Sequence, residues 1–187
     1  MAKLIFIGGN RGIGKTMLST RICEEISFNY IQYSRFCINT SNRLYGASDW
    51  VTISRNSQEI HSEFINSVNF LSNKGVIIDG HYSYYDSPPF SDEEFIRLIE
   101  DSRGLLVLLR APIELIMQRV REDPRDRKII KSSIEQDIYW NNKMYSHYLS
   151  KALERKKLVR GVVLENIYLA RCLQESYQVI EDFFKDT

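Results

Sequence analysis

The sequence predicts a three-layer α/β domain, in which helices cover both faces of a five-stranded parallel sheet. Five short runs of apolar and β-branched residues are continuous rather than alternating, as is typical of parallel strands covered on both faces. Helical periodicities fall between these runs, and this alternation favours right-handed crossovers. The 187 residues suffice for one domain with a full core and are too few for two. The predicted strands are residues 4–7, 30–33, 76–78, 105–109 and 162–164.

The predicted helices carry apolar residues three or four positions apart. Leu18, Ile22 and Ile26 follow the first strand, and a similar repeat over residues 60–71 precedes the third. The helix over residues 113–120 begins beside Pro112, a residue type that suits the first turn. Residues 169–184 form an apolar stripe that is typical of a closing helix.

Composition excludes several classes of protein. The 25 basic residues nearly balance the 24 acidic ones, so no overall field favours nucleic acid or a membrane surface. No apolar run is long enough to span a bilayer, and the N-terminus lacks the pattern of a signal peptide. The three cysteines have no metal-like spacing, and Cys23 and Cys172 sit in apolar helical patterns that predict buried free thiols. We therefore expect a cytoplasmic protein.

A phosphate-binding motif follows the first strand and opens the first helix. Its glycines let the backbone turn tightly and direct N–H groups at phosphate oxygens, and the helix N-terminus adds partial positive charge. Lys15 would reach the β- and γ-phosphates of ATP, and the Thr16 hydroxyl is suited to bind Mg²⁺. The motif consists of Gly9, Asn10, Arg11, Gly12, Ile13, Gly14, Lys15 and Thr16.

A carboxylate follows the third predicted strand. Asp79 ends the apolar run 76–78, where P-loop enzymes carry an acid that holds Mg²⁺. Mg²⁺ prefers oxygen ligands and keeps several waters, so Asp79 would bind it directly or through water. The alternative is an aspartate that caps the next turn.

Two polar segments interrupt the alternation of strands and helices. Residues 34–57 and 121–131 are predicted to be mobile excursions from the sheet, of the kind that often carries function. The guanidinium groups of Arg119, Arg125 and Arg127 would stabilise a phosphoryl group in transfer if the second segment closes over it. The alternative is that both segments are plain surface loops.

Further motifs connect these residues to a known family. Residues 78–83 are similar to a strand ending in Asp-Thr-His, Pro88 and Pro89 stand near the place of a Pro-Gly-Leu-Pro segment, and residues 119–127 are similar to a lid with an Arg-x-Arg pair. On these motifs the sequence resembles the nucleoside monophosphate kinases, most closely the archaeal-type adenylate kinases and related kinases of unassigned substrate. Similarity extends over nearly the whole chain, including the helix after the lid.

The resemblance implies an ATP- and Mg²⁺-dependent kinase whose acceptor is a small molecule, with a nucleoside monophosphate as the first expectation. It implies one P-loop kinase domain with a core of residues 1–33, 58–120 and 132–187, an acceptor-binding insert at 34–57 and a lid at 121–131. Asn166 falls where the family's loop contacts the adenine of ATP. For the acceptor, the candidates are Ser34, Arg55 and His81, with Arg43 as a second choice to Arg55.

The sequence departs from the family in one informative place. Asn142 stands where the helix after the lid often has an arginine, and Lys143 is the neighbouring cation. Two alternatives therefore stay open beside the nucleotide kinase. One is a P-loop kinase for a hydroxyl-bearing metabolite, in which Asp79 or His81 helps to activate the hydroxyl. The other is an ATPase or switch protein controlled by a macromolecular partner.

Overall fold

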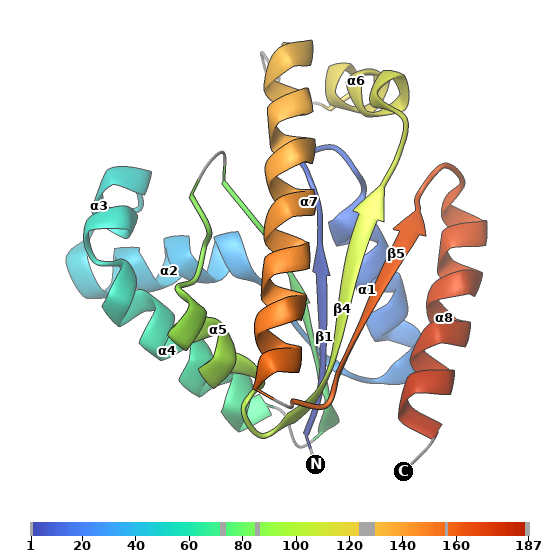
Figure 1. The fold of residues 1–187 in the computed structure, drawn as a ribbon. Coiled ribbons are helices and arrows are strands. Elements are labelled where there is room, and N and C mark those ends of the chain that lie inside the picture. The colour runs from blue at the N-terminus through green and yellow to red at the C-terminus, as the bar shows by residue number, and fades with distance from the viewer. Residues whose placement is uncertain (1, 72–73, 85–86, 124–129, 156, 186–187) are drawn as a thin grey trace.

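A computed structural model describes residues 2–71, 74–84, 87–123, 130–155 and 157–185. It confirms the predicted sheet: five parallel strands in the order β2-β3-β1-β4-β5 (Figure 1). The order places the first strand at the centre, so that the loop after it opens in the middle of the sheet's carboxyl edge. The strands are β1 (Ala2–Gly8), β2 (Asn29–Gln32), β3 (Val76–Asp79), β4 (Ser102–Arg110) and β5 (Val159–Glu165).

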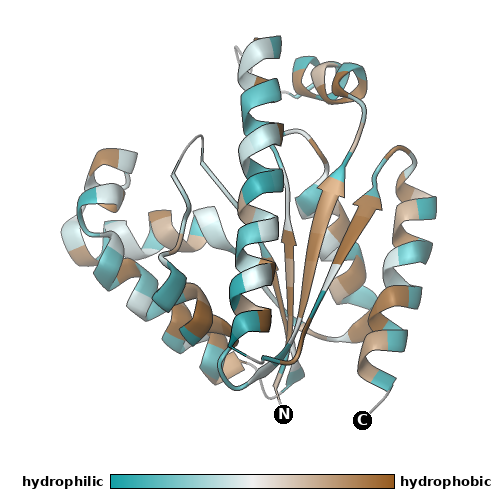
Figure 2. Cartoon of the chain, viewed as in Figure 1, coloured by the Kyte–Doolittle hydropathy of each residue, from teal (hydrophilic) through white to brown (hydrophobic). Residues whose placement is uncertain are grey.

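Helices cover both faces of this sheet, as the sequence predicts (Figure 1). Alternate side chains of β1 separate into two cores: Leu4 and Phe6 pack with helices α4, α5 and α7, whereas Ile5 and Ile7 pack with α1, α6 and α8. Figure 2 colours most of β4 brown, while α7 is mainly teal and white along its outer side. The helices are α1 (Lys15–Ile26), α2 (Tyr33–Tyr45), α3 (Trp50–Arg55), α4 (Ser57–Leu71), α5 (Asp92–Ile99), α6 (Ile113–Arg121), α7 (Lys131–Glu154) and α8 (Leu169–Lys185).

The segment 34–57 is largely helical, so the alternative of a plain surface loop is wrong for it. The strand predicted over residues 30–33 ends at Gln32, and Tyr33 already belongs to α2. Gly46 ends α2 with φ 67°, in the left-handed region that glycine favours. Asp49 then caps α3 by accepting a hydrogen bond from the Thr52 N–H.

The start of α2 is fixed by a buried hydrogen-bonded chain. The Tyr33 hydroxyl lies 2.8 Å from His61 Nε2 of α4, and His61 Nδ1 lies 2.9 Å from the Glu94 carboxylate of α5. Tyr33 and His61 are buried. The chain therefore connects helices α2, α4 and α5 at Tyr33, the residue that precedes Ser34.

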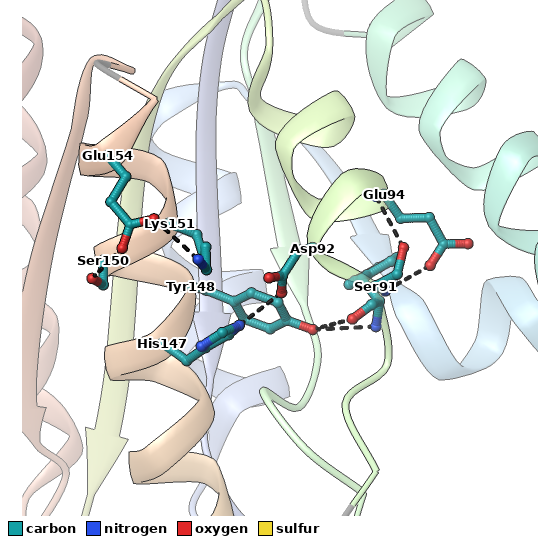
Figure 3. A network of polar contacts seen from close by, with 9 residues as sticks. Ser91, Asp92, Glu94, His147, Tyr148, Ser150, Lys151 and Glu154 are labelled. Atoms are coloured by element: carbon teal, nitrogen blue, oxygen red, sulfur yellow. Dashed lines mark hydrogen bonds and ion pairs between the residues drawn. The ribbon is translucent and has the colours of Figure 1, made fainter.

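Helix α5, which periodicity does not predict, is anchored to α7 by the network in Figure 3. Ser91 and Glu94 form a capping box at its N-terminus. Asp92 lies 2.7 Å from His147 Nε2, and the Tyr148 hydroxyl donates a 2.6 Å hydrogen bond to the Phe90 carbonyl. These contacts fix the position of α7, whose N-terminal half stands beside the phosphate-binding loop.

Two other expectations can be compared with the described chain. Cys23, Cys37 and Cys172 are free thiols; Cys37 and Cys172 are buried, whereas Cys23 is only half-buried. Within the described ranges no helix combines the length and the apolar character that crossing a membrane requires.

Candidate active site

The phosphate-binding loop lies between β1 and α1 and has the backbone of an anion cradle. Gly12 and Gly14 adopt φ 74° and 93°, which other residues rarely do. A Cβ at Gly14 would lie 2.6 Å from Asn166 Nδ2, so this position also needs glycine for space. Gly14 begins α1 without a side-chain cap, which leaves the helix's first N–H groups available to an anion.

Lys15 is buried at the base of this loop, with 8% of its surface exposed. Its Nζ donates hydrogen bonds of 3.0 Å and 2.9 Å to the carbonyls of Gly9 and Asn10. The ammonium group is thus held inside the curve of the loop. A phosphate bound by the loop's N–H groups would meet this charge at close range.

Thr16 and Asp79 bring two oxygen donors together beside the loop. The Thr16 hydroxyl donates a 2.5 Å hydrogen bond to Asp79 Oδ2, and the Tyr30 hydroxyl donates another of 3.1 Å to the same atom. Asp79 is 3% exposed. Burial and the Asp79 charge raise the pKa of Tyr30 above its ordinary range, so Tyr30 stays a neutral donor.

These oxygens fit the Mg²⁺ of an ATP complex. A hard cation that keeps several waters needs only one or two protein oxygens beside the phosphates. No cluster of three or more histidine, cysteine or acidic residues suited to a metal is found in the described ranges, so a dedicated all-protein metal cage is not seen there. The pair Thr16 and Asp79 is the combination that a phosphate-borne Mg²⁺ requires.

A cavity of about 730 Å³ extends from this loop along the carboxyl edge of the sheet. It joins Lys15, Thr16 and Asp79 to the predicted residues Arg119, Asn166, Ser34 and His81. Arg11 of the phosphate-binding motif also lines this cavity. The other side chains on its wall come from outside the motif: Met17, Gln32, Tyr84, Glu122, Asp123 and Leu169.

Arg119 and Asn166 connect the loops that form one end of the cavity through hydrogen bonds to backbone carbonyls. The Arg119 guanidinium donates hydrogen bonds to the carbonyls of Ile13, Asn166 and Ile167, at 3.2, 2.9 and 3.3 Å. Asn166 Nδ2 donates a 2.6 Å bond to the Ile13 carbonyl, and its Oδ1 is buried with no partner in the described chain. These residues connect α6, the phosphate-binding loop and the loop after β5, where the sequence predicts an adenine contact.

The structure does not bring every predicted acceptor residue to the cavity. Arg55 is exposed at the end of α3 and does not line it, which corrects its predicted position. Arg43 is paired with Glu63 on the surface. The sequence shows that arginines follow the second strand. It does not show toward which side of the insert the helices orient their side chains. Arg125 and Arg127 lie outside the described residues.

Sequence reasoning missed several side chains of the site. Tyr30 and Gln32 belong to β2, and Gln32 reaches the wall of the cavity because it ends that strand; this position was a usable signal. Asp137 is buried on α7, and burial raises the pKa of its carboxyl. No local motif marks Asp137, because its surroundings are formed by distant parts of the chain.

Comparison with known proteins identifies the fold. No protein-family model and no curated protein sequence matches the chain. Among solved structures, shikimate kinase from Acinetobacter baumannii in complex with shikimate superposes with a TM-score of 0.61 at 15% identity, over 100% of this chain and 96% of that one. The chain has the P-loop kinase fold.

Two further solved structures agree with this fold. A sugar kinase from Janibacter sp. HTCC2649 gives a TM-score of 0.60 at 15% identity, over 97% of this chain and 95% of that one. Shikimate kinase from Bacteroides thetaiotaomicron gives 0.55 at 16% identity, over 97% and 99%. The P-loop kinase resemblance is thus supported at the level of fold, whereas these three proteins do not single out nucleoside monophosphate kinases.

Proposed function

We propose that the protein is an ATP-dependent kinase that phosphorylates a small metabolite. One observation carries this proposal: a single cavity joins Lys15, Thr16 and Asp79 to Ser34 and His81, two side chains placed after neighbouring strands. A kinase needs the nucleotide phosphates and the acceptor in one enclosed space, because transfer depends mainly on positioning. The kinase names of the similar structures support the same activity.

The phosphate-binding loop marks the end of the cavity at which the nucleotide would bind. The N–H groups at the start of α1 and the Lys15 ammonium would hold the phosphates, while Thr16 and Asp79 would hold Mg²⁺. Bound Mg²⁺ would neutralise charge on the phosphates. Arg119 and Asn166 would position the loop that faces the adenine.

The acceptor end favours a hydroxyl-bearing metabolite. Its described side chains, Gln32, Ser34, His81 and Tyr84, supply hydrogen-bonding groups and rings. The predicted acceptor arginine, Arg55, lies elsewhere, whereas binding a monophosphate calls for cationic forks. The structures named for shikimate and sugar kinases favour the same choice. His81 is our candidate base for the acceptor hydroxyl.

A nucleoside monophosphate is the second candidate acceptor. The motif at residues 78–83 and the lid-like tract 119–127 support it. Arg125 and Arg127 stay predicted lid residues, and closure of the segment 121–131 over the acceptor would exclude water from the reaction. If this segment acts as a lid, Arg127→Ala reduces phosphoryl transfer far more than ATP binding.

The same proposal includes a reducing compartment, such as the cytoplasm. Cys37 and Cys172 are buried free thiols, and Cys23 is a half-buried one. The three cysteines therefore do not form the disulfide framework that is typical of small secreted domains.

The deciding experiment measures ADP formation by the purified protein with ATP and Mg²⁺. The acceptors are sugars, shikimate, nucleosides and nucleoside monophosphates, each tested separately, and the product is identified by mass. Selective stimulation by one hydroxyl compound supports a hydroxyl-bearing metabolite as the acceptor. Selective stimulation by one monophosphate supports a nucleoside monophosphate as the acceptor. Slow hydrolysis that no acceptor stimulates favours a partner-controlled ATPase. Lys15→Ala is the control: it weakens ATP binding and abolishes turnover in all three cases, without unfolding the chain.

A further inference from the structure

Two side chains of β2 lie beside Thr16 and Asp79, the pair of oxygen donors that fits Mg²⁺. Tyr30 and Gln32 are two positions apart, so they lie on the same face of their strand. β2 pairs in parallel with β3, with Tyr30 opposite Ile77 and Gln32 opposite Asp79. Tyr30 and Ile77 pack in the core that includes residues of α1. This face of β2 is therefore directed at α1, the helix that carries Thr16 in its first turn.

The Asp79 carboxylate is held through its Oδ2 atom by two hydroxyl groups. Thr16, on α1, donates at 2.5 Å, and Tyr30, on β2, donates at 3.1 Å. No hydrogen bond to Oδ1 is found in the part of the chain that the structure describes. Gln32 Nε2 lies 3.5 Å from the Thr16 hydroxyl oxygen, at the long limit of a hydrogen bond. Tyr30 is therefore the residue of β2 that fixes the carboxylate.

The backbone of Asp79 is fixed by the sheet on both sides. Asp79 ends β3 and pairs with Ile7 of β1 and with Gln32 of β2. The pairing extends one residue further, since the Gly80 N–H donates to the Ile7 carbonyl at 3.1 Å. The carboxylate can then turn only through the side-chain torsions of Asp79. The hydrogen bond from Tyr30 restrains these torsions, and a ligand that is restrained beforehand loses less entropy when a metal binds.

The two donors to Oδ2 differ in what Mg²⁺ binding would require of them. Thr16 is itself a predicted metal ligand, so its hydroxyl would leave the carboxylate when the metal is bound. Tyr30 is half-buried, and burial together with the Asp79 charge raises the pKa of its hydroxyl, which keeps it neutral. A neutral phenol is not among the ligands that Mg²⁺ prefers. The hydrogen bond of Tyr30 therefore persists while that of Thr16 is exchanged.

We propose that Tyr30 is a positioning residue of the Mg²⁺ site, whose hydroxyl keeps the Asp79 carboxylate in one orientation while the Thr16 hydroxyl turns to the metal. The inference rests on the proposed kinase function. Tyr30 acts through Asp79, because it does not itself line the cavity of about 730 Å³ in which nucleotide and acceptor would meet. Loss of its hydroxyl should weaken the contribution of the metal without weakening the binding of metal-free nucleotide.

The test measures how much Mg²⁺ increases the affinity of the protein for a non-hydrolysable ATP analogue. Calorimetry in Mg²⁺ and in EDTA gives two dissociation constants, and their ratio is the gain that the metal brings. For Tyr30→Phe we expect an affinity in EDTA within about threefold of the parent, because the ring and its packing are kept. The gain from Mg²⁺ should fall by roughly tenfold, the lower end of the loss caused by removing an outer-shell partner, since the phosphates also hold the metal.

Tyr45→Phe is the matched control. The Tyr45 hydroxyl also donates to a carboxylate, that of Glu59 at 2.6 Å, but this contact joins α2 to α4 and neither residue lines the cavity. Tyr45→Phe should keep the gain of the parent.

A double variant tests whether Tyr30 acts through Asp79. Asp79→Asn alone should lose most of the gain from Mg²⁺. Addition of Tyr30→Phe should lower the gain no further, because the two residues act as one unit. A further loss in the double variant would overturn the inference, since Tyr30 would then act apart from Asp79.

The other outcomes separate the failures. A parent-like gain in Tyr30→Phe overturns the inference, as does an equal loss of affinity in Mg²⁺ and in EDTA, which indicates a structural role. A parent that binds the analogue but gains nothing from Mg²⁺ overturns the metal site and the inference with it. Failure of the folded parent to bind the analogue instead removes the proposed kinase function. If a thermal scan shows that Tyr30→Phe is unfolded, Tyr30→Met, a flexible apolar side chain without a hydroxyl, decides in the same way.

Discussion

The Thr16 hydroxyl donates a 2.5 Å hydrogen bond to the Asp79 carboxylate, joining the first turn of α1 to the last residue of β3. This contact brings the phosphate-binding loop and the strand-end acid to one place. Register explains it: β1 and β3 pair in parallel with Ile7 opposite Asp79, so the loop begins beside that carboxylate. Mg²⁺ bound to a phosphate on the loop would exchange the hydroxyl–carboxylate bond for metal–oxygen contacts.

Asp79→Asn should therefore reduce turnover by at least about 100-fold, the scale of losing one preorganised charge-stabilising group. The amide keeps the size of the side chain but lacks the negative charge that attracts Mg²⁺. The measurement is turnover against Mg²⁺ concentration, with the expectation that the variant needs more metal for its residual rate. Asp182→Asn, on the exposed side of α8, is the matched control. A parent-like Mg²⁺ dependence in Asp79→Asn would exclude Asp79 as the metal residue.

Arg119→Gln should weaken ATP binding by roughly tenfold, the effect of about 1.4 kcal/mol. The change removes guanidinium bonds to three carbonyls that fix the nucleotide end of the cavity. Calorimetry with a non-hydrolysable ATP analogue measures the affinity. Arg97→Gln, exposed on α5, should leave it unchanged. Equal affinity in the two variants would show that these carbonyl bonds do not position the nucleotide.

The sheet was predictable because its strands are short, continuous apolar runs. Such runs are typical of parallel strands that helices cover on both faces. The helices α2 and α5 were harder. Two of the buried positions of α2 are polar, Thr40 and Ser41, so hydrophobic periodicity is weak there. For α5 a signal was present: Ser91 and Glu94 have the spacing of a capping box and precede the apolar Phe95.

The candidate site was predictable to the extent that it follows strand ends. Ser34 and His81 reach the cavity because parallel strands direct the residues after them to one edge of the sheet. Arg55 does not, because the direction of α3 depends on packing within the insert. The burial of Asp137 depends on how α7 crosses the sheet, which is fixed by contacts such as that of Asn141 with the loop after β3.

Gly8→Ala should destabilise the fold by about 1–3 kcal/mol, the usual cost of inserting a methyl group into a packed core. A Cβ at this position would lie 2.3 Å from the Tyr82 ring. The ring cannot easily retreat, because its hydroxyl donates 3.1 Å hydrogen bonds to the carbonyls of Phe6 and Val107. Urea unfolding measures the change. Tyr82→Phe keeps the ring and loses only those bonds, so the clash should persist in the double variant; a parent-like stability of Gly8→Ala would contradict the close approach.

Burial of two thiols predicts a loss of stability at alkaline pH. Burial raises the pKa of Cys37 and of Cys172 to about 11, from an ordinary value near 9.0. Between these values the thiols ionise in the unfolded chain and stay protonated in the folded one, so the free energy of unfolding is undiminished below about pH 9 and falls toward pH 11. The same ionisation controls alkylation, because the thiolate is the reactive form.

Urea unfolding of the parent and of Cys172→Ala at pH 8 and pH 10 measures this effect. The variant should lose less stability between the two pH values than the parent, since one titrating group has been removed, even if its stability at pH 8 is lower. Cys23→Ala is a comparison at a half-buried thiol, whose Sγ donates to the Phe28 carbonyl at 2.6 Å. Tyrosines that also titrate at high pH are common to all three proteins and cancel in the differences. An identical pH dependence in Cys172→Ala and the parent would show that this thiol ionises alike in the folded and unfolded chains.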